Sequence, residues 1–385
     1  MSIESLPRIL SIRFTANILT LLFMASTTSA QTSKVAEKTS PSLSWVMQDS
    51  GTTASLRGIY SVDNKIAWAS GTAGTILKTT DGGSHWTQCS IPPDGQSLDF
   101  RGVQAFDATT AIVMASGPGE KSRLYNTTDG CKTWKLLFKN PDAPDGFFDS
   151  FFADWYLESG NPKWTGSLLG DPVGGRFVIF DTLDSGTRWT LRKNDALALN
   201  TINVSAFAAS NSLFPEDQNK AHEEHIFASG GKSGAILWME KTPELTWNKI
   251  ALPLMYGTDS SGVFSIASHT DSEPFRNVVA LRETIVAVGG DYQKPDESAG
   301  TAAWSTDLGL HWTAAIKSPH GYRSSVSWSE ELAAWITAGT NGSDISRDDG
   351  KTWQLIDNGN WNALSLPFVV GPKGRIARLA GAEPK

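Results

Sequence analysis

Residues 79–86, Thr-Thr-Asp-Gly-Gly-Ser-His-Trp, carry a motif that recurs along the chain and decides its fold. The pattern Ser/Thr-x-Asp-x-Gly-x-x-Trp is matched in full at residues 79–86, 182–189, 305–312 and 346–353. Residues 127–134 match it except that Cys131 replaces the glycine, and a degenerate copy ends at Trp247. A motif that returns in this way indicates a repeat protein, in which each unit packs on its neighbours.

The motif has the chemistry of a tight turn between two strands. An Asp side chain accepts backbone N–H bonds across such a turn, Gly supplies a positive φ, and Ser or Thr adds a second local bond. The tryptophan that closes each copy is expected to pack between neighbouring units. We therefore assign a structural role to the five motif aspartates, Asp81, Asp129, Asp184, Asp307 and Asp348.

A second signature precedes each turn: an apolar strand that ends in glycine, then a strand that starts after another small residue. Alternation and turn chemistry make each copy a β-hairpin. The seven copies begin at Ala67, Ala111, Trp164, His225, Ile285, Ala333 and Pro367. Leu43-Ser44-Trp45-Val46 resembles the strand that follows each turn, so we expect it to supply the outer strand of the seventh unit. The sequence predicts an all-β fold, a seven-bladed β-propeller of four-stranded units, closed by N- and C-terminal strands that share one blade.

The first thirty residues read as a signal peptide. Arg8 and Arg13 flank the start of an apolar run that is about as long as a secretory signal and too short for a spanning helix. An uncleaved anchor is the alternative. We predict a signal peptide at residues 1–30, a flexible leader at 31–42 and the propeller at 43–380. The mature chain is expected to be a periplasmic or secreted monomer with no membrane span.

The two cysteines, Cys89 and Cys131, lie near the ends of neighbouring repeat units. Cys89 follows Trp86 by three residues, and Cys131 precedes Trp134 by three. Oxidising compartments permit disulfides, and unpaired thiols are a liability outside the cell. We therefore expect Cys89 and Cys131 to pair, with two free thiols as the alternative.

The repeats resemble those of the Asp-box propellers, which include sialidases, xyloglucan-cleaving glycosidases, sortilin-type receptors and the photosystem II stability/assembly factor family. The stretch LRGIYSVDNKIAWASGTAGTILKTTDGGSHW, residues 56–86, reads much like a repeat of the last family. That resemblance covers nearly all of residues 43–380. It implies the propeller fold strongly and an activity only poorly, because propellers host unrelated functions.

Composition excludes several classes of partner. The chain has 33 Lys and Arg against 40 Asp and Glu, a formal net charge of −7, and no basic cluster. Nucleic-acid binders need a concentrated basic footprint, so we expect no nucleic acid. Apolar residues make up 40% of the chain and charged residues 19%, which permits a large core. No motif points to a cofactor or a metal, and we expect neither.

Propeller topology separates two faces. If each blade runs from an innermost strand a to an outermost strand d, the Asp boxes at the c–d turns lie on one face. The starts of strands a and the b–c loops lie on the other. Three strands a begin with an arginine, Arg57, Arg101 and Arg323. Because innermost strands line the channel, we expect three guanidiniums around one mouth, suited to a carboxylate or phosphate.

The expanded b–c loops and the strand starts add further candidates at that rim, namely Asp171, Arg176, Asp291, Tyr292 and Tyr322. Binding residues concentrate on loops that a rigid scaffold carries. The alternative is that the arginines pair with these aspartates as structural ion pairs. We predict a non-catalytic binding or assembly scaffold that recognises an anionic group of a protein or glycan partner.

A glycoside hydrolase is the rival function. The resemblance to sialidases implies three arginines for the sugar carboxylate, a Tyr nucleophile and an Asp acid/base, behind a Phe/Tyr-Arg-Ile-Pro start. Residues 56–59, Leu-Arg-Gly-Ile, occupy a comparable place but lack the proline. A glycosidase needs two carboxyls roughly 5 to 10 Å apart across a cleft. The residues assigned to that alternative are Asp171, Asp291 and Tyr292.

Overall fold

The computed structural model describes residues 43–159, 161–192, 197–199, 202–213, 226–241, 246–275 and 278–381. The predicted signal peptide and leader lie outside these residues. Within them, no helix has both the length and the apolar character needed to cross a membrane.

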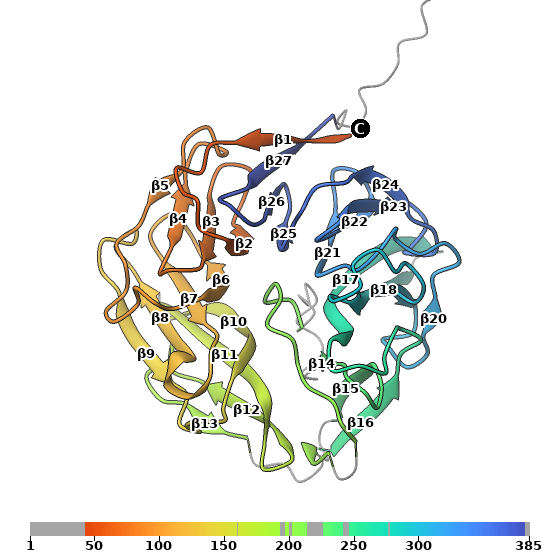
Figure 1. The fold of residues 1–385 in the computed structure, drawn as a ribbon, viewed down its shortest axis with the longest axis horizontal. Coiled ribbons are helices and arrows are strands. Elements are labelled where there is room, and N and C mark those ends of the chain that lie inside the picture. Colours follow the sequence, from red (N-terminus) through yellow and green to blue (C-terminus); the bar gives the residue numbers. More distant parts are fainter. Residues whose placement is uncertain are drawn as a thin grey trace, which may run out of the picture. The chain divides into compact units, whose positions relative to one another are not determined.

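Seven antiparallel sheets form a ring in the described part of the chain, and Figure 1 shows it with the sheets arranged radially. Blade 1 contains β2 (Leu56–Ser61), β3 (Ala67–Gly71), β4 (Ile76–Thr79) and β5 (Thr87–Gln88). Blade 2 contains β6 (Phe100–Ala105), β7 (Ala111–Ala115), β8 (Arg123–Thr127) and β9 (Lys135–Lys139), with the 3-10 turn η1 (Gly119–Lys121) between β7 and β8. Blade 3 contains β10 (Phe148–Glu158), β11 (Asn161–Val173), β12 (Arg176–Thr182) and β13 (Thr190–Leu191).

The remaining blades follow in chain order. Blade 4 contains β14 (Ile226–Ser229), β15 (Ile236–Lys241) and β16 (Thr246–Ala251). Blade 5 contains β17 (Ser261–Phe275), β18 (Val278–Asp291), β19 (Ala302–Ser305) and β20 (Thr313–Ala314). Blade 6 contains β21 (Ser325–Ser329), β22 (Ala334–Gly339), β23 (Gly342–Ser346) and β24 (Gln354–Asp357). Blade 7 contains β25 (Ala363–Ser365), β26 (Phe368–Val370) and β27 (Ile376–Ala380), with β1 (Ser44–Gln48) as its outer strand.

The two ends of the described chain share blade 7. Strand β1 runs antiparallel to β27, with Trp45 opposite Leu379 and Gln48 opposite Ile376. The Trp45 indole N–H donates to Ser343 Oγ of blade 6 at 2.8 Å, which fastens the outer strand to the neighbouring blade. The predicted seven-bladed propeller, closed by strands from both ends of the chain, is confirmed.

Blade 4 differs from the prediction of four strands in every unit. Among the residues that the structure describes, its sheet has three strands, β14, β15 and β16. In place of an innermost strand, residues 202–213 follow an irregular path, and Ser205 makes one isolated β-bridge with Gly230. Figure 1 shows this light-green segment reaching toward the middle of the ring. The ladder is short because residues 206–213 bond instead to the inner strands of other blades, as described below.

The Asp boxes form the c–d turns, with one shared set of hydrogen bonds. Asp81 Oδ1 accepts the His85 N–H and the Thr79 hydroxyl, both at 2.9 Å, and Thr79 Oγ1 accepts the Gly83 N–H at 2.9 Å. The other four boxes repeat these bonds. The fourth and fifth box residues have φ between 58° and 83°, a left-handed conformation that favours glycine. These aspartates therefore organise turns.

The box tryptophans pack toward the preceding blade. The Trp86 ring lies edge-on to Phe368 of blade 7 with 5.6 Å between ring centroids, and its N–H donates to Gln48 of β1 at 3.0 Å. Trp189 of blade 3 stacks on Phe138 of blade 2 at 5.3 Å. Each such ring buries apolar surface between two sheets, which holds neighbouring blades together.

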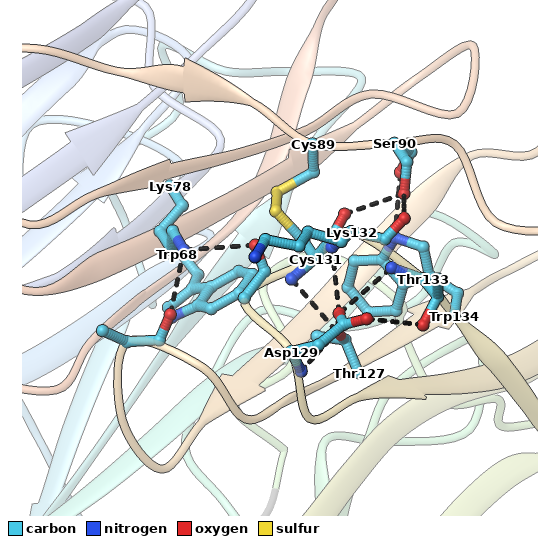
Figure 2. Close-up of a disulfide and its surroundings, with 12 residues drawn as sticks. Trp68, Lys78, Cys89, Ser90, Thr127, Asp129, Cys131, Lys132, Thr133 and Trp134 are labelled. Carbon is cyan, nitrogen blue, oxygen red and sulfur yellow. Dashed lines mark hydrogen bonds between the residues drawn. A yellow bond between two sulfur atoms is a disulfide. The ribbon is translucent and has the colours of Figure 1, made fainter.

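A disulfide ties blade 1 to blade 2. Cys89 follows β5, Cys131 occupies the glycine position of the second Asp box, and their sulfurs lie 2.01 Å apart. Figure 2 shows the bridge beside the Asp129 turn. The Ser90 hydroxyl donates to the Cys131 carbonyl at 2.7 Å, and the Trp134 indole donates to the Ser90 carbonyl at 2.9 Å. The seam between these two blades is thus fixed covalently and by hydrogen bonds.

Candidate functional site

A cavity of about 580 Å³ opens at the channel mouth where the innermost strands begin. We call it the mouth cavity. Six of the seven blades each contribute one residue from a strand start: Arg57, Arg101, Asp149, Phe264, Ser324 and Asn362. The Asp boxes lie at the opposite ends of the blades, since the c–d turns and the starts of the inner strands are at opposite ends of an antiparallel sheet.

A β-bulge directs these side chains inward. In blade 1, Leu56 pairs with Gly71 and Gly58 pairs with Ser70, so Arg57 is the extra residue of the inner strand. The same shift leaves Arg101 as the extra residue in blade 2. Register shifts at the starts of β10 and β17 leave Asp149 and Phe264 unpaired in the same way. A bulge re-aims one side chain without disturbing the rest of the sheet, which suits a site built on a rigid ring.

Blades 6 and 7 place their residues one step before the inner strand. The Ser324 N–H donates to the Ala338 carbonyl at 2.9 Å, and the Asn362 N–H donates to the Val370 carbonyl at 2.7 Å. Ser324 and Asn362 therefore occupy the place that the bulge residues hold in the other blades. Both are polar and small, so this side of the mouth cavity has hydrogen-bonding groups and no charge.

The irregular segment of blade 4 closes the floor of the cavity. The Ala206 N–H donates to Asp171 Oδ1 at 3.1 Å, and Phe207 stacks on Phe264 with ring centroids 4.1 Å apart. The Ala208 carbonyl faces Arg101 Nη1 at 3.4 Å. Residues 205–209 all line the cavity, so this segment separates the mouth from the deeper channel.

Two arginines supply positive charge to the mouth cavity. Arg101 forms an ion pair with Asp99, Nε to Oδ2 at 2.8 Å, and its guanidinium lies 5.9 Å from the Phe147 ring centre. Arg57 Nε is buried and has no hydrogen-bond partner among the described residues. Burial lowers the Arg57 pKa, the Arg101 charge lowers it further, and Asp99 partly opposes them. A buried guanidinium N–H without an acceptor is costly, so this group is available to a ligand that carries one.

Two carboxyls face these arginines. Asp149 is 1% exposed and Asp171 is partly buried, and both line the mouth cavity. Burial raises the Asp171 pKa to about 6, although the hydrogen bond from the Ala206 N–H lowers it in part. Burial raises the Asp149 pKa well above its usual range, Asp171 raises it further, and the Arg101 charge opposes both. The cavity therefore has a cationic side, from blades 1 and 2, and a side with carboxyls of weakened acidity, from blade 3.

Aromatic rings form the remaining wall. Tyr322 is buried and lies edge-on to Phe264 with 4.8 Å between ring centroids. Burial raises the Tyr322 pKa far above its usual range, so its hydroxyl stays protonated at neutral pH. Tyr292 is 48% exposed and stands at the rim, 6.2 Å from Phe264. An apolar segment of a ligand can pack here beside the charged groups.

The prediction for Arg323 is wrong. Its side chain is 0% exposed and does not line the mouth cavity. Nε donates to Asp344 at 2.8 Å and Nη1 donates to Asn341 at 2.6 Å, with His320 also in contact. Its buried charge is therefore neutralised inside blade 6. The alternative of a structural ion pair holds for this arginine, but its partner is Asp344, which was not among the predicted aspartates.

Backbone bonds explain this difference. The Arg323 N–H donates to the carbonyl of Gly289, a glycine near the end of strand b (β18) in the preceding blade. The Leu56 N–H makes the equivalent bond to Gly371. Arg323 thus occupies the buried position of Leu56, one residue before the position of Arg57, and Ser324 takes the cavity position.

The structure separates the other predicted rim residues. Asp171, Tyr292 and Tyr322 line the mouth cavity, and Asp291 and Arg176 are not among its lining residues. Asp291 is 2% exposed. Burial alone would raise its pKa, but hydrogen bonds from Ser260, Gln293 and Thr258 lower it. Asp171 and Asp291 therefore do not form the carboxylate pair that the glycosidase alternative requires, because Asp291 serves to hold its own loop.

The residue that sequence reasoning missed is Asp149. Its signal is the triplet Phe148-Asp149-Ser150, an apolar residue, a charged residue and a small residue at the start of an inner strand. This is the same order as Phe100-Arg101-Gly102. Among the residues that the structure describes, no cluster of three or more His, Cys, Asp or Glu side chains is arranged to hold a metal ion.

The fold and the site define a class: an Asp-box β-propeller with a charged cavity at one mouth of its channel. The chain is 22% identical over 358 residues to the photosystem II assembly lipoprotein Ycf48 of Synechococcus sp. strain CC9902, a match that covers 89% of this chain and 90% of that protein. A solved structure described as YCF48 bound to D1 peptide is similar, with a TM-score of 0.54, 18% identity and coverage of 87% of this chain and 96% of that one.

A second solved structure, YCF48 from Cyanidioschyzon merolae, has a TM-score of 0.54 and 17% identity, covering 88% of this chain and all of that one. No family model matches the chain. The resemblance to the photosystem II assembly factor family and the propeller fold are confirmed by these comparisons.

Proposed function

We propose that this protein is a non-catalytic binding or assembly scaffold that recognises an anionic group of a protein partner in the mouth cavity. The observation that carries the proposal is the pairing of Arg57 and Arg101 at equivalent bulges, with Arg57 Nε buried and without an acceptor. Guanidinium groups hold carboxylates and phosphates through charge-assisted hydrogen bonds. A partner's acidic group would supply the acceptor that Arg57 lacks.

A protein partner is favoured over a glycan by two lines of support. The relative from Synechococcus is an assembly lipoprotein, and one similar structure has a D1 peptide bound. The aromatic wall of Phe264, Tyr292 and Tyr322 offers apolar surface beside the charges. A peptide with an acidic residue next to an apolar one matches both features.

Binding without catalysis is supported by the arrangement of the carboxyls. Asp149 is 1% exposed, so a substrate has little access to it, and Asp291 is engaged in its own loop. Of the other two carboxyls on the cavity, Asp259 is in an ion pair with Lys232, which leaves Asp171, whereas glycoside hydrolysis needs two carboxyls that flank one bond.

We also propose that the chain works outside the cytosol. The disulfide between Cys89 and Cys131 supports this, because thiols are kept reduced in the cytosol. The predicted signal peptide at residues 1–30 is consistent with export.

The test is fluorescence anisotropy with three labelled, end-capped peptides that share apolar and aromatic residues and carry Glu-Glu, Gln-Gln or Lys-Lys at the centre. We expect the Glu peptide to bind most tightly and to lose most of its affinity with the double variant Arg57→Ala/Arg101→Ala. Arg176→Ala is the matched control, because this exposed arginine does not line the cavity. Equal binding of the three peptides, or full binding by the double variant, would contradict the proposal. Binding of sialyllactose in the same assay in place of the Glu peptide would make the partner a glycan.

A further inference from the structure

The two carboxyls of the mouth cavity lie on paired strands. Phe148 pairs with Gly170, so Asp149 and Asp171 follow them on β10 and β11. The Asp171 N–H donates to the Phe147 carbonyl at 2.9 Å, which fixes the two segments together. Both carboxyls line the mouth cavity, together with the segment that carries Ala206 and Ala208.

The hydrogen bonds of Asp149 are incomplete. The backbone N–H groups of Ala208 and Asp171 act in the opposite direction to burial and lower the pKa of its carboxyl. Its second oxygen, Oδ2, is buried and has no partner. A carboxylate oxygen in that position would be an unsatisfied buried charge, which is costly. A carboxyl group that carries a proton removes that charge.

The charges around the pair come from five other elements. Arg57 and Arg101 face it from β2 and β6, and Asp99, before β6, is in an ion pair with Arg101. Tyr322, before β21, is buried and neutral. Tyr292, after β18, stands at the rim. Asp259, before β17, is 72% exposed at its side chain and forms an ion pair with Lys232. Within the described part of the chain, Asp149 and Asp171 are thus the two carboxyls of this cavity that have no ion-pair partner.

We propose that Asp149 and Asp171 share one proton at neutral pH and that this proton sets the affinity of the mouth cavity for an anion. The inference rests on the proposed function. With the proton bound, the pair carries one negative charge and offers one O–H donor beside Arg57. Without it, two negative charges oppose the arginines, and an incoming anion is repelled.

The direction of the pKa shifts of Asp149 and Asp171 is the one expected for a pair that holds a proton. Burial raises the pKa of Asp171 to about 6. Burial, together with the Asp171 charge, raises the pKa of Asp149 well above its usual range. Two carboxyls in one site titrate as a pair, so one proton persists above the pH at which an exposed aspartate has lost its own. Linkage is reciprocal: an anion in the cavity raises the pair's affinity for the proton, so anion binding takes up protons.

The proton itself can be observed without a ligand. Infrared spectra of the full chain at pH 6.5 should show the C=O stretch of a protonated carboxyl, because ordinary Asp and Glu are ionised there. We expect Asp149→Asn and Asp171→Asn each to remove or shift the band. Asp259→Asn is the matched control at the same cavity and should leave the band unchanged. Absence of the band in the unaltered chain at pH 6.5 would overturn the inference.

Binding of the labelled Glu peptide tests the coupling. We expect about ten-fold weaker binding at pH 8.5 than at pH 6, since one unit of charge changes within the cavity. The double variant Asp149→Asn/Asp171→Asn should bind about equally at both pH values. A peptide affinity that falls with pH in the double variant as in the unaltered chain would overturn the inference and leave the proposed function standing. Failure of the peptide to bind at either pH would contradict the proposed function, and the infrared band would still decide whether the pair holds a proton.

Discussion

Arg101 and Arg323 both lie at the start of an innermost strand, and the fold gives them opposite environments. Arg101 is the extra residue of a bulge and lines the mouth cavity, while Arg323 lies one position earlier in its own blade and is 0% exposed. The first pairs with Asp99 at the surface of the cavity, the second with Asp344 in the interior. A shift of one residue along the strand therefore separates a ligand-facing arginine from a structural one.

The position of a residue relative to the bulge decides whether it is buried between blades or faces the channel. Positions before the bulge donate backbone bonds to the neighbouring blade and are buried, as Leu56, Arg323 and Trp361 are. Positions at the bulge face the channel and vary in charge from blade to blade. Substitutions on either side of this boundary should therefore affect different properties of the protein.

The largest effect is expected from Arg323→Ala. Removing this arginine leaves Asp344 buried without its counter-ion, which should lower the free energy of unfolding by about 3 to 5 kcal/mol. Denaturant titration followed by tryptophan fluorescence would measure it, with Arg101→Ala as the matched control. A loss in the Arg323 variant no larger than in the control would show that the two arginines have equivalent roles.

The second effect concerns Arg57 and appears in binding. Arg57→Ala should weaken the Glu peptide by about 1.5 to 3 kcal/mol, the range for a hydrogen bond to a charged group. The free energy of unfolding of this variant should change by less than about 1 kcal/mol, because the substitution removes a buried N–H that has no partner among the described residues. Isothermal titration with a parallel melt separates the two readouts. A stability loss like that expected for Arg323, with unchanged affinity, would place Arg57 in the scaffold.

The third effect is the pH dependence of stability that Asp171 contributes at the mouth cavity. The Asp171 pKa is raised above its unfolded value, so the folded state binds more protons and this group's contribution to stability falls as pH rises from about 4 to 7. We expect a decrease of about 2 kcal/mol over that interval, abolished in Asp171→Asn. Chemical denaturation across the pH range measures it. An identical pH profile in the variant would show that the carboxyl is not perturbed.

The smallest effect lies on the opposite face. Hydrogen bonds from His85 hold the Asp81 pKa at about 2, so its contribution is present above an unfolded pKa near 4 and is lost as pH falls toward 2. Asp81→Ala should slightly lower the denaturant midpoint at pH 7, because the turn loses its capping side chain. Peptide affinity should not change. Altered affinity in this variant would mean that the two faces are coupled.

The features predicted from the sequence are those with a local chemical signal. The Asp boxes predicted the turns, and the strand pattern around Trp45 predicted the shared blade. Both predictions were possible because turn chemistry and strand alternation depend on residues that are adjacent in the sequence. Arg57, Arg101 and Arg323 were all predicted at the mouth because each lies at the start of an innermost strand in the sequence. One small residue follows Arg57 and Arg101, whereas two, Ser324 and Ser325, follow Arg323, and the sequence does not show which residue takes the cavity position.

Features that depend on distant segments were not predicted. Asp149 lies at a bulge that appears only once β10 is paired with β11. The irregular path of residues 202–213 in blade 4 follows from bonds of this segment to other blades, such as that of Ser210 to the Ser324 carbonyl at 2.7 Å. Ser210 and Ser324 lie more than one hundred residues apart, and no local pattern in the sequence indicates their contact.

A crystal structure of the chain with the Glu peptide bound would test most directly whether the mouth cavity is the binding site. We expect a peptide carboxylate within hydrogen-bond distance of the Arg57 guanidinium, on the side of the cavity that Arg101 shares, with apolar peptide residues against Phe264 and Tyr322. A carboxylate bound elsewhere on the propeller, with Arg57 still lacking an acceptor, would contradict it.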